Sequence, residues 1–431
     1  MKALLRTTPL IASADLIVDP PVAANVGDQI EFGCRLVEDY GPTRRIWFRF
    51  PRDYAPVLSQ RADPFVIATL NYAMGRVRRL RVHGAVSEGL FANLTEFQTA
   101  FSAFHHQPLP DVVEFSATET AEPIVRSRHP IGITAFSGGV DGSFSIYRHT
   151  GLSSLTPKRP IRAALMMHGF DIPLEQPEVF RTAAERARLM TDDAGLQFYT
   201  GATNLRTIPM SWTDTFATAV AASLAFFQPA CAFGLVPSFQ DWTHVRFDHG
   251  SNPLTDPLLS SPSFQIIHDG AGFGRIDKLR HLANWPAALR HLRVCWQGDQ
   301  LDRNCGRCEK CVRTMLMLRI CGVREPGAFP RELDVGQLDD LVINSQAGLD
   351  EFSYLLEEAR RIGLDEPWMK PTARALRRNR RNLRLWHRGK SVAEIVPPRV
   401  RQVLRKAGYR WLLKAPAPAA GTSVAPHVAA R

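Results

Sequence analysis

A glycine-rich turn between a short apolar run and a helical segment constrains this chain more than any other feature. The run Ile131–Phe136 leads into Ser137–Ser143, which reads Ser-Gly-Gly-Val-Asp-Gly-Ser, and a helical pattern follows. Paired glycines let the backbone approach a ligand closely, and the amides at a helix N-terminus converge on an anion. The sequence therefore predicts a strand, a phosphate-binding loop and a helix, in that order.

The residue types in this loop narrow the kind of phosphate site. The loop has neither the lysine of a Walker A motif nor the spacing G-x-G-x-x-G. Its two serines can add hydroxyl donors, and Asp141 fits an anion site if Mg²⁺ bridges it to the phosphates. The alternative is a strand-to-helix turn that binds nothing. The predicted cofactor-binding residues of the loop are Ser137, Gly138, Gly139, Val140, Asp141, Gly142 and Ser143.

Strand-like and helical runs alternate from Ile131 onward, which indicates an α/β fold with a parallel sheet and crossover helices. Ligands of such sheets bind at the carboxyl ends of the strands, so the loops after Phe136, Met167 and Thr200 should face one crevice. The further strands are expected at Ile161–Met167, Leu196–Thr200 and Cys231–Val236, and the helices at Glu178–Ala194 and Trp212–Phe227.

The sequence of residues 1–125 predicts an α+β domain of unknown role before the alternating strands and helices. The polar segment Ala117–His129 is expected to link the two. Strands are predicted at Ile30–Val37, Ile46–Phe50, Leu80–His83 and Val112–Ser116, and helices at Pro64–Ala73 and Ser87–Phe104. The expected organisation is 1–125, a nucleotide-binding domain with a cysteine cluster at 130–324, a helical basic extension at 325–414 and a disordered tail at 415–431.

The positive charge of the chain concentrates at its C-terminal end. The net charge is +11, whereas residues 371–431 hold 15 Lys and Arg and the single acid Glu394, which gives +14 and leaves −3 for the other 370 residues. Arg374–Arg388 could bind nucleic acid or anionic lipid, and the helical pattern around Val400–Trp411 could lie on a membrane surface. The alternative is a packed helix with solvated arginines.

Other bulk features favour a cytoplasmic protein. No run of about 18 apolar residues predicts a membrane span. Pro9, Ser13 and Asp15 interrupt the N-terminal apolar run, which makes a secretory signal a poor interpretation. Tightly clustered cysteines are typical of a metal site in a reducing compartment.

The cysteine cluster has the spacing Cys-x9-Cys-x2-Cys-x2-Cys. Four thiolates suit tetrahedral Zn²⁺ in a closed, structural site. An iron–sulfur cluster is the rival, and unmetallated thiols are disfavoured because exposed thiols oxidise. The predicted metal ligands are Cys295, Cys305, Cys308 and Cys311.

The loop resembles the S-G-G-x-D-S signature of the PP-loop (N-type ATP pyrophosphatase-like) superfamily, which includes asparagine synthetase, GMP synthetase and 7-cyano-7-deazaguanine synthase. Four positions match, but Gly142 stands where serine is usual. The cysteines, with Gly306 inside the cluster, resemble the C-terminal end of 7-cyano-7-deazaguanine synthase, and the likeness spans about residues 130–320. The resemblance implies a HUP/Rossmann-like domain, ATP and Mg²⁺ at the loop, and zinc on the four cysteines.

The resemblance also implies a reaction and candidate residues for it. A carboxylate or amide of a small-molecule substrate becomes adenylated, pyrophosphate leaves, and ammonia or an amine displaces AMP. The catalytic candidates are Asp141, Arg275 and Lys278. The two cations could offset the charge of the leaving pyrophosphate; a solvated helix face is the alternative for them. Asp171, Asn204 and Arg206 follow predicted strands and could bind ATP or substrate, whereas Asp256 is a weaker candidate and His244 and His249 are expected to be surface or packing residues.

Lys2 stands where an N-terminal glutaminase would have its cysteine, so a separate ammonia donor could be needed.

Two other functions stay open. A tRNA-thiolating enzyme would use reactive cysteines such as Cys231 or Cys321, and the basic C-terminal region favours it. A non-catalytic nucleotide-binding protein is suggested by Gly142.

Overall fold

The computed structural model describes most of the chain between residues 15 and 395. The described residues are 15–105, 112–124, 130–295, 298, 300–330, 332–343 and 345–395, with side chains up to residue 384. The predicted pattern at 400–411 and the predicted tail at 415–431 lie outside them. The chain forms two compact units, Met1–Arg293 and Val294–Arg431. None of the helices in the described ranges has the length and apolar character that a membrane span requires.

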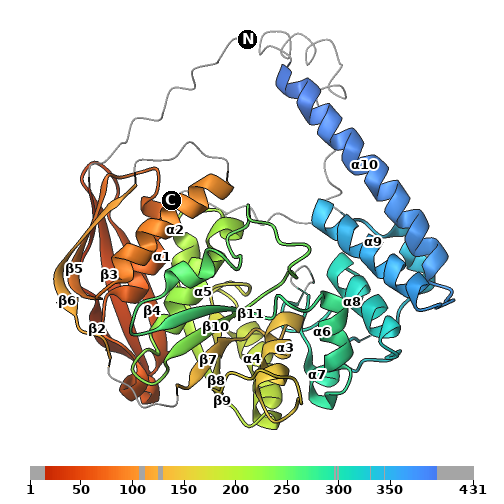
Figure 1. Cartoon of the computed structure of the whole chain (residues 1–431), viewed down its shortest axis with the longest axis horizontal. Coiled ribbons are helices and arrows are strands. Elements are labelled where there is room, and N and C mark those ends of the chain that lie inside the picture. The colour runs from red at the N-terminus through yellow and green to blue at the C-terminus, as the bar shows by residue number, and fades with distance from the viewer. Residues whose placement is uncertain are drawn as a thin grey trace. The chain divides into compact units, whose positions relative to one another are not determined.

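An eleven-stranded sheet runs through the unit Met1–Arg293 (Figure 1), and ten of its strands follow the order β11-β10-β7-β8-β9-β4-β3-β1-β5-β6, with β2 paired to β3. The five strands from β11 to β9 are parallel to one another. The strands are β1 (Asp15–Val18), β2 (Val22–Val26), β3 (Gln29–Glu38), β4 (Arg44–Pro51), β5 (Arg79–Ser87), β6 (Glu114–Ala121), β7 (Gly132–Ala135), β8 (Ile161–His168), β9 (Gln197–Thr203), β10 (Phe233–Pro237) and β11 (Gln265–Asp269).

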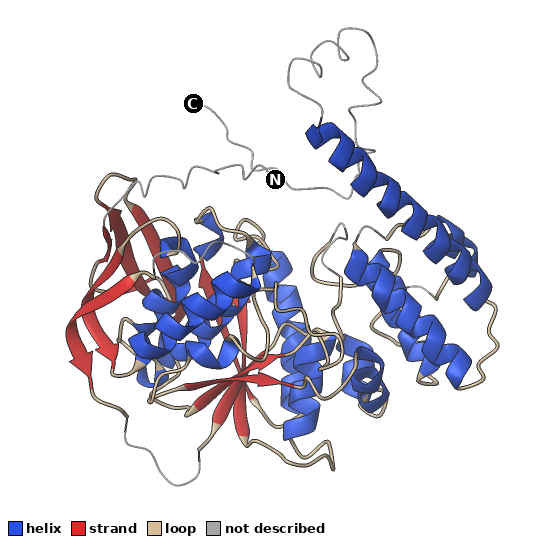
Figure 2. Cartoon of the chain, turned by 45° about the horizontal axis from the view of Figure 1, so that its top comes forward, coloured by secondary structure: helices blue, strands red, loops and turns tan. Residues whose placement is uncertain are grey.

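Helices pack on both faces of this sheet (Figure 2). The prediction of a mixed α/β fold with a large, mostly parallel sheet is therefore confirmed. The helices of this unit are α1 (Asp63–Ala73), α2 (Leu90–Phe104), α3 (Val140–His149), α4 (Pro177–Asp193), α5 (Trp212–Ala225), α6 (Arg275–Leu282) and α7 (Pro286–His291), with 3₁₀ turns η1 (Arg52–Val57), η2 (Leu205–Thr207) and η3 (Asp256–Leu259).

The strand order reverses beside β7. The chain steps outward from β7 to β8 and β9, and then returns to place β10 on the other side of β7. Right-handed crossovers put α3 and α4 on one face and α5 on the other, which agrees with the packing of α4 on α7 and of α5 on α1. Crevices at such reversal points bind ligands in α/β sheets, and the glycine-rich loop follows β7.

The N-terminal strands join the parallel strands without a break. Phe48 and Arg49 of β4 pair antiparallel with Thr203 and Ala202 of β9. The segment Ala117–His129 was predicted to be a polar linker, but its beginning, up to Ala121, belongs to β6. β6 pairs in parallel with β5. Where the sequence predicts a boundary near residue 125, the strands on either side thus belong to one sheet.

Phe226, directly after α5, ties these two regions into one core. Its ring is fully buried and lies 4.9 Å from Phe48, 5.2 Å from Phe32 and Phe50, and 5.9 Å from Phe65, measured between ring centroids. The four neighbours come from β3, β4 and α1. Phe226, which belongs to the region of parallel strands, is therefore buried among side chains of the N-terminal region.

The unit Val294–Arg431 is helical in its described part. It contains α8 (Glu309–Ile320), η4 (Val335–Asp340), α9 (Gln346–Arg361) and α10 (Met369–Ile395). Ser345 caps α9, accepting a hydrogen bond from the Gly348 amide. The buried Asn379 of α10 accepts a hydrogen bond from the Ile343 amide and donates to the Leu341 carbonyl. These bonds hold α10 to the segment after η4.

Candidate active site and metal centre

The glycine-rich loop connects β7 to α3 at the carboxyl edge of the parallel strands. Gly139 is the N-cap of α3, and Gly138 has a φ of 78°, a conformation that residues with a side chain rarely adopt. The carbonyls of Ser137 and Gly138 both accept hydrogen bonds from Arg293, at 3.1 Å and 2.7 Å. Since the C=O and N–H of a trans peptide point in opposite directions, the amides of Gly138 and Gly139 point away from Arg293. These two amides are thus candidate donors to an anion.

Asp141, Arg275 and Lys278 meet beside this loop, although Asp141 is 134 and 137 positions from the other two in sequence. Asp141 Oδ1 lies 3.1 Å from Lys278 Nζ and Asp141 Oδ2 lies 3.3 Å from Arg275 Nη1. Lys278 is 1% exposed and also donates to the carbonyl of Ser238, the residue after β10. The Lys278 ammonium therefore joins the loop after β7 to the residue after β10, and the strand order reverses between these two strands. Arg275 and Lys278 thus place two cations next to the predicted phosphate loop.

Arg293 is a site residue that the sequence did not reveal. Its side chain is 5% exposed, and its Nη2 atom lies 3.5 Å from Asp171 Oδ2. Because it also donates to the Ser137 carbonyl, this guanidinium connects the loop after β7 to the loop after β8. The sequence around Arg293 does not indicate this role, because Ser137, whose carbonyl accepts the hydrogen bond, lies 156 positions earlier.

The departure from the PP-loop signature at Gly142 has a structural cause. A Cβ atom on Gly142 would lie 3.1 Å from Phe136 Cδ2 and 3.3 Å from the Ala135 carbonyl oxygen, so the end of β7 leaves little room there. Ser143 does not replace the missing hydroxyl, because it is fully buried and donates to the Gly139 carbonyl at 2.7 Å. Val140 is also buried, so only its backbone can face a ligand.

The other residues predicted to contact the cofactor differ in their exposure and in their hydrogen-bond partners. Asp171 is 46% exposed beside Arg293. Asn204 accepts a hydrogen bond from the Trp47 amide and donates to the Arg45 carbonyl, both at 2.9 Å, so its amide group is occupied in joining β9 to β4. Arg206 donates to the Phe170 carbonyl and lies over the Trp212 ring. The structure thus brings Asp171 close to the loop through Arg293 and gives Asn204 a structural partner.

The turn after β8 requires glycine. Gly169 has a φ of 94°, and a Cβ atom there would lie 2.0 Å from the Thr203 carbonyl oxygen. The preceding His168 stacks on Phe180 and its Nε2 atom bonds to the Pro173 carbonyl. Burial lowers the pKa of His168 below its usual range. This histidine is therefore a packing residue that fixes the path of the turn leading to Asp171.

The weaker polar candidates are structural. Asp256 is fully buried, accepts from Ser251 and pairs with His268 at 2.7 Å. His249 packs between Phe216 and Phe239, and burial lowers its pKa. His244 is exposed and bonds to Asp241.

A second buried charge cluster lies at the end of β11. Asp269 accepts hydrogen bonds from Ser145, Arg148 and His149 of α3, at 2.7 Å, 3.1 Å and 2.9 Å. Burial alone would raise the pKa of Asp269, but the hydrogen bond and charge of His149, with Ser145 and Arg148, outweigh it and hold that pKa below its usual range. The cluster fastens α3, the helix that begins at the glycine-rich loop.

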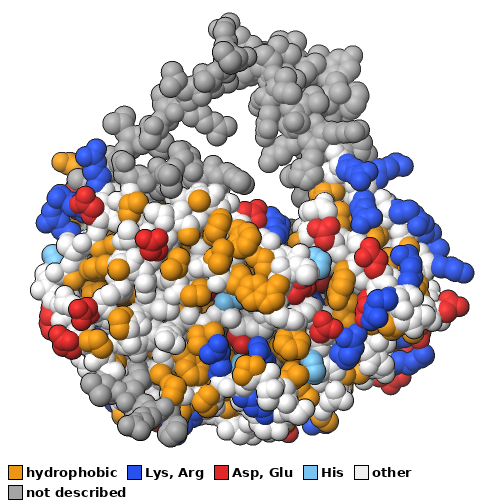
Figure 3. Space-filling model, in the orientation of Figure 1, with side chains coloured by type: hydrophobic (Ala, Val, Ile, Leu, Met, Phe, Trp, Pro, Cys, Tyr) orange, Lys and Arg blue, Asp and Glu red, His pale blue; other side chains and the backbone are white. Residues whose placement is uncertain are grey.

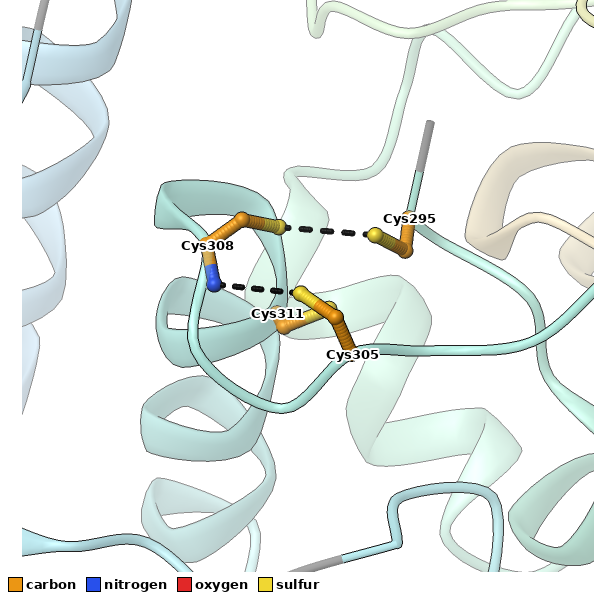
Figure 4. A group of neighbouring side chains, drawn as sticks. All are labelled: Cys295, Cys305, Cys308 and Cys311. Atoms are coloured by element: carbon orange, nitrogen blue, oxygen red, sulfur yellow. Dashed lines mark hydrogen bonds between the residues drawn. The ribbon is translucent and has the colours of Figure 1, made fainter. Parts of the chain in front are cut away.

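The four predicted metal ligands converge at the start of α8 (Figure 4). Their sulfur atoms all lie within 4.8 Å of one another. Cys295 Sγ is 3.7 Å from Cys308 Sγ, and Cys305 Sγ is 3.9 Å from Cys311 Sγ. A tetrahedron with Zn–S distances of about 2.3 Å has edges of about 3.8 Å. The donor set therefore fits one tetrahedral ion.

Neighbouring groups hold these cysteines in place. The buried Asn304 side chain accepts hydrogen bonds from the amides of Val294 and Cys295 and donates to the Ala328 carbonyl. The Cys308 amide donates to Cys305 Sγ at 3.3 Å. The hydrogen bond to the Cys295 thiol raises the pKa of Cys308 to about 12. Asn304 was not predicted, although it lies next to the cysteines in sequence.

Comparison with known proteins gives one informative match. The chain is 28% identical over 114 residues to the 7-cyano-7-deazaguanine synthase of Rhizobium rhizogenes. These residues make up 26% of this chain, and they span less than half (42%) of the synthase. The resemblance to 7-cyano-7-deazaguanine synthase is thus confirmed. No protein-family model matches the chain, and no solved structure matches it significantly.

Proposed function

We propose that this chain is an ATP-dependent enzyme that adenylates a carboxylate or amide substrate and then transfers ammonia or an amine to it. The observation that carries the proposal is the contact of Asp141 with Arg275 and Lys278 beside the loop after β7. The similarity to a 7-cyano-7-deazaguanine synthase supports the same class of reaction.

The proposed chemistry needs little beyond positioning and charge. The loop amides and the N-terminus of α3 would bind the phosphates of ATP. A substrate oxygen attacks the α-phosphorus, and the bond to the β-phosphate oxygen breaks, so that pyrophosphate leaves with its charge next to Arg275 and Lys278. The nitrogen nucleophile then displaces AMP from the activated carbon. Asp141 is the carboxylate that would hold Mg²⁺, and this ion would supply positive charge to offset that of the phosphates.

The cysteine centre would hold zinc in a structural role. All four cysteines act as ligands, so no coordination position is left for a substrate. A multi-iron cluster fits less well, because its cysteines bind different iron atoms and these sulfur atoms all lie within 4.8 Å of one another. The proposed task of the ion is to hold Cys295 to the start of α8.

The position of Cys231 argues against thiolation through that residue. Cys231 is 4% exposed and precedes β10, and the next amide, that of Ala232, bonds to the carbonyl of Ile131 before β7. The residue therefore lies at the amino edge of the parallel strands, whereas the glycine-rich loop follows their carboxyl edge. Cys321 is the half-buried residue that ends α8.

A non-catalytic nucleotide-binding protein remains the second candidate. Gly142 and the inward hydroxyl of Ser143 favour it, because the loop then lacks one donor of the family signature. Arg275 and Lys278 beside the loop favour the enzyme, because two cations there would offset the charge of a leaving pyrophosphate.

ATP–pyrophosphate exchange tests the proposal. Purified protein is assayed with a panel of carboxylic acids, amides and bulk tRNA, comparing wild type with Asp141→Asn, Lys278→Met and Cys231→Ala. We expect one substrate to support exchange, a loss of about 10²-fold or more in the first two variants, and full activity in the third. Full exchange in Asp141→Asn would show that the loop does not act as proposed, and ATP binding without exchange for any substrate would favour the non-catalytic alternative.

A further inference from the structure

A run of positively charged residues follows α10. Residues 369–395 contain nine Lys and Arg and one acid, Glu394. With 3.6 residues per turn, five of those whose side chains are described fall within an arc of about 80° and extend along about 21 Å of helix. We call this set the basic stripe; it consists of Lys370, Arg374, Arg377, Arg381 and Arg384. Figure 3 shows Lys and Arg side chains following one another along the described part of α10.

The members of the basic stripe differ in their partners. Arg374 is held by Asp339, with Nη2 to Oδ2 at 2.7 Å. Lys370, Arg377, Arg381 and Arg384 are exposed, and among the described residues no acidic side chain pairs with them. Like charges three and four positions apart repel one another by about 0.2–0.5 kcal/mol per pair. An external anion would relieve this repulsion.

The opposite face of α10 is already used. Ala375, Leu376 and Asn379 are buried, and Asn379 bonds to the backbone after η4. A helix that binds a membrane surface needs an apolar face to insert between lipids. In its described part α10 has its apolar face packed within its own unit, so the partner must be recognised by charge alone.

From these observations we infer that the basic stripe binds the phosphate backbone of a nucleic acid. One strand of nucleic acid offers about six phosphates over 21 Å, enough to meet each cation of the stripe. Guanidinium groups bind phosphate with two parallel hydrogen bonds. The +14 charge of residues 371–431 would add long-range attraction. The inference does not depend on the proposed ATP chemistry.

Salt-dependent binding tests this surface. Anisotropy of labelled single-stranded RNA and duplex DNA of about 20 nucleotides is measured with the full chain at several salt concentrations. Each phosphate contact contributes about 0.7 (single strand) to 0.9 (duplex) to the slope of log K against log salt. The variant Arg377→Gln/Arg381→Gln/Arg384→Gln should therefore lose about 2 to 3 from that slope.

Two further variants make the result specific. The control, Arg162→Gln/Arg181→Gln/Arg188→Gln, removes the same charge from exposed positions of the other unit and should keep the wild-type slope. The variant Arg377→Lys/Arg381→Lys/Arg384→Lys should also keep most of that slope, because the charges remain. Equal losses in both glutamine variants, or no nucleic-acid binding by the wild type, would overturn the inference. Stripe-dependent binding to anionic vesicles without nucleic-acid binding would assign the surface to a membrane instead.

Discussion

Replacing Phe226 by alanine tests whether the N-terminal strands and the parallel strands share one core. The ring is fully buried and touches four other phenylalanine rings at 4.9–5.9 Å. Removing a buried phenylalanine costs about 3–5 kcal/mol, and each lost aromatic pair adds about 0.5–1.5 kcal/mol beyond the area buried. Rigid aromatic neighbours cannot easily fill the cavity, so we expect a loss of about 4 kcal/mol or more in the free energy of unfolding.

Hydrogen exchange followed by mass spectrometry reads this loss in each region separately. A loss of 4 kcal/mol raises the population of the open state by about 10³. Exchange should therefore speed up by that factor in peptides from both β3–β4 and β7–β8. The control is Leu189→Ala on α4, which is 45% exposed and should cost less than about 0.5 kcal/mol.

The regions in which hydrogen exchange becomes faster decide whether the two groups of strands share one core. Faster exchange in β3 and β4 with no change in β7 and β8 would refute the shared core and restore a folding boundary near residue 125. A uniform loss below about 1 kcal/mol would refute the reasoning about Phe226 itself.

Two further predictions concern the metal centre and acid stability. Purified protein should contain one zinc ion per chain, lost in Cys308→Ser together with several kcal/mol of stability but retained in Cys321→Ser; elemental analysis with thermal unfolding checks this, and several iron atoms per chain would contradict it. The lowered pKa of Asp269 contributes stability that is fully present above its unfolded pKa of about 3.9 and is lost as the pH falls through the folded pKa. Asp269→Asn should thus be less stable at pH 7 by about 2 kcal/mol and show a flatter fall in urea-unfolding free energy below about pH 4; a variant with the wild-type pH profile would contradict this.

Local patterns in the sequence were sufficient for most elements. The helix predicted at Glu178–Ala194 is α4 at Pro177–Asp193, because its apolar residues recur at helical spacing. The strand predicted at Ile161–Met167 is β8, because a strand buried on both faces has a continuous apolar run. The exposed β2 (Val22–Val26) and the short β1 and β11 were missed, since their stability depends on pairing with distant strands.

Contacts between distant segments could not be predicted from such patterns. The pairing of β4 with β9 depends on the positions of Phe48 and Thr203, 155 residues apart. Asn204 follows a strand and was predicted to bind a cofactor, but its amide bonds to β4. Arg293 was missed for the same reason. In contrast, the four cysteines could be predicted as a group, because three of them lie within seven residues and their short spacers leave few ways to arrange the thiols.

The antiparallel pairing of β4 with β9 bears on how this protein can be dissected in the laboratory. Expressing residues 130–293 as a minimal ATP-binding fragment would strip the partner from β9 and uncover Phe226. An unpaired strand edge is a template for another chain, and an exposed aromatic surface beside it promotes aggregation. Insolubility of such a fragment would therefore carry no information about nucleotide binding, and truncations intended for biochemistry should begin ahead of β1.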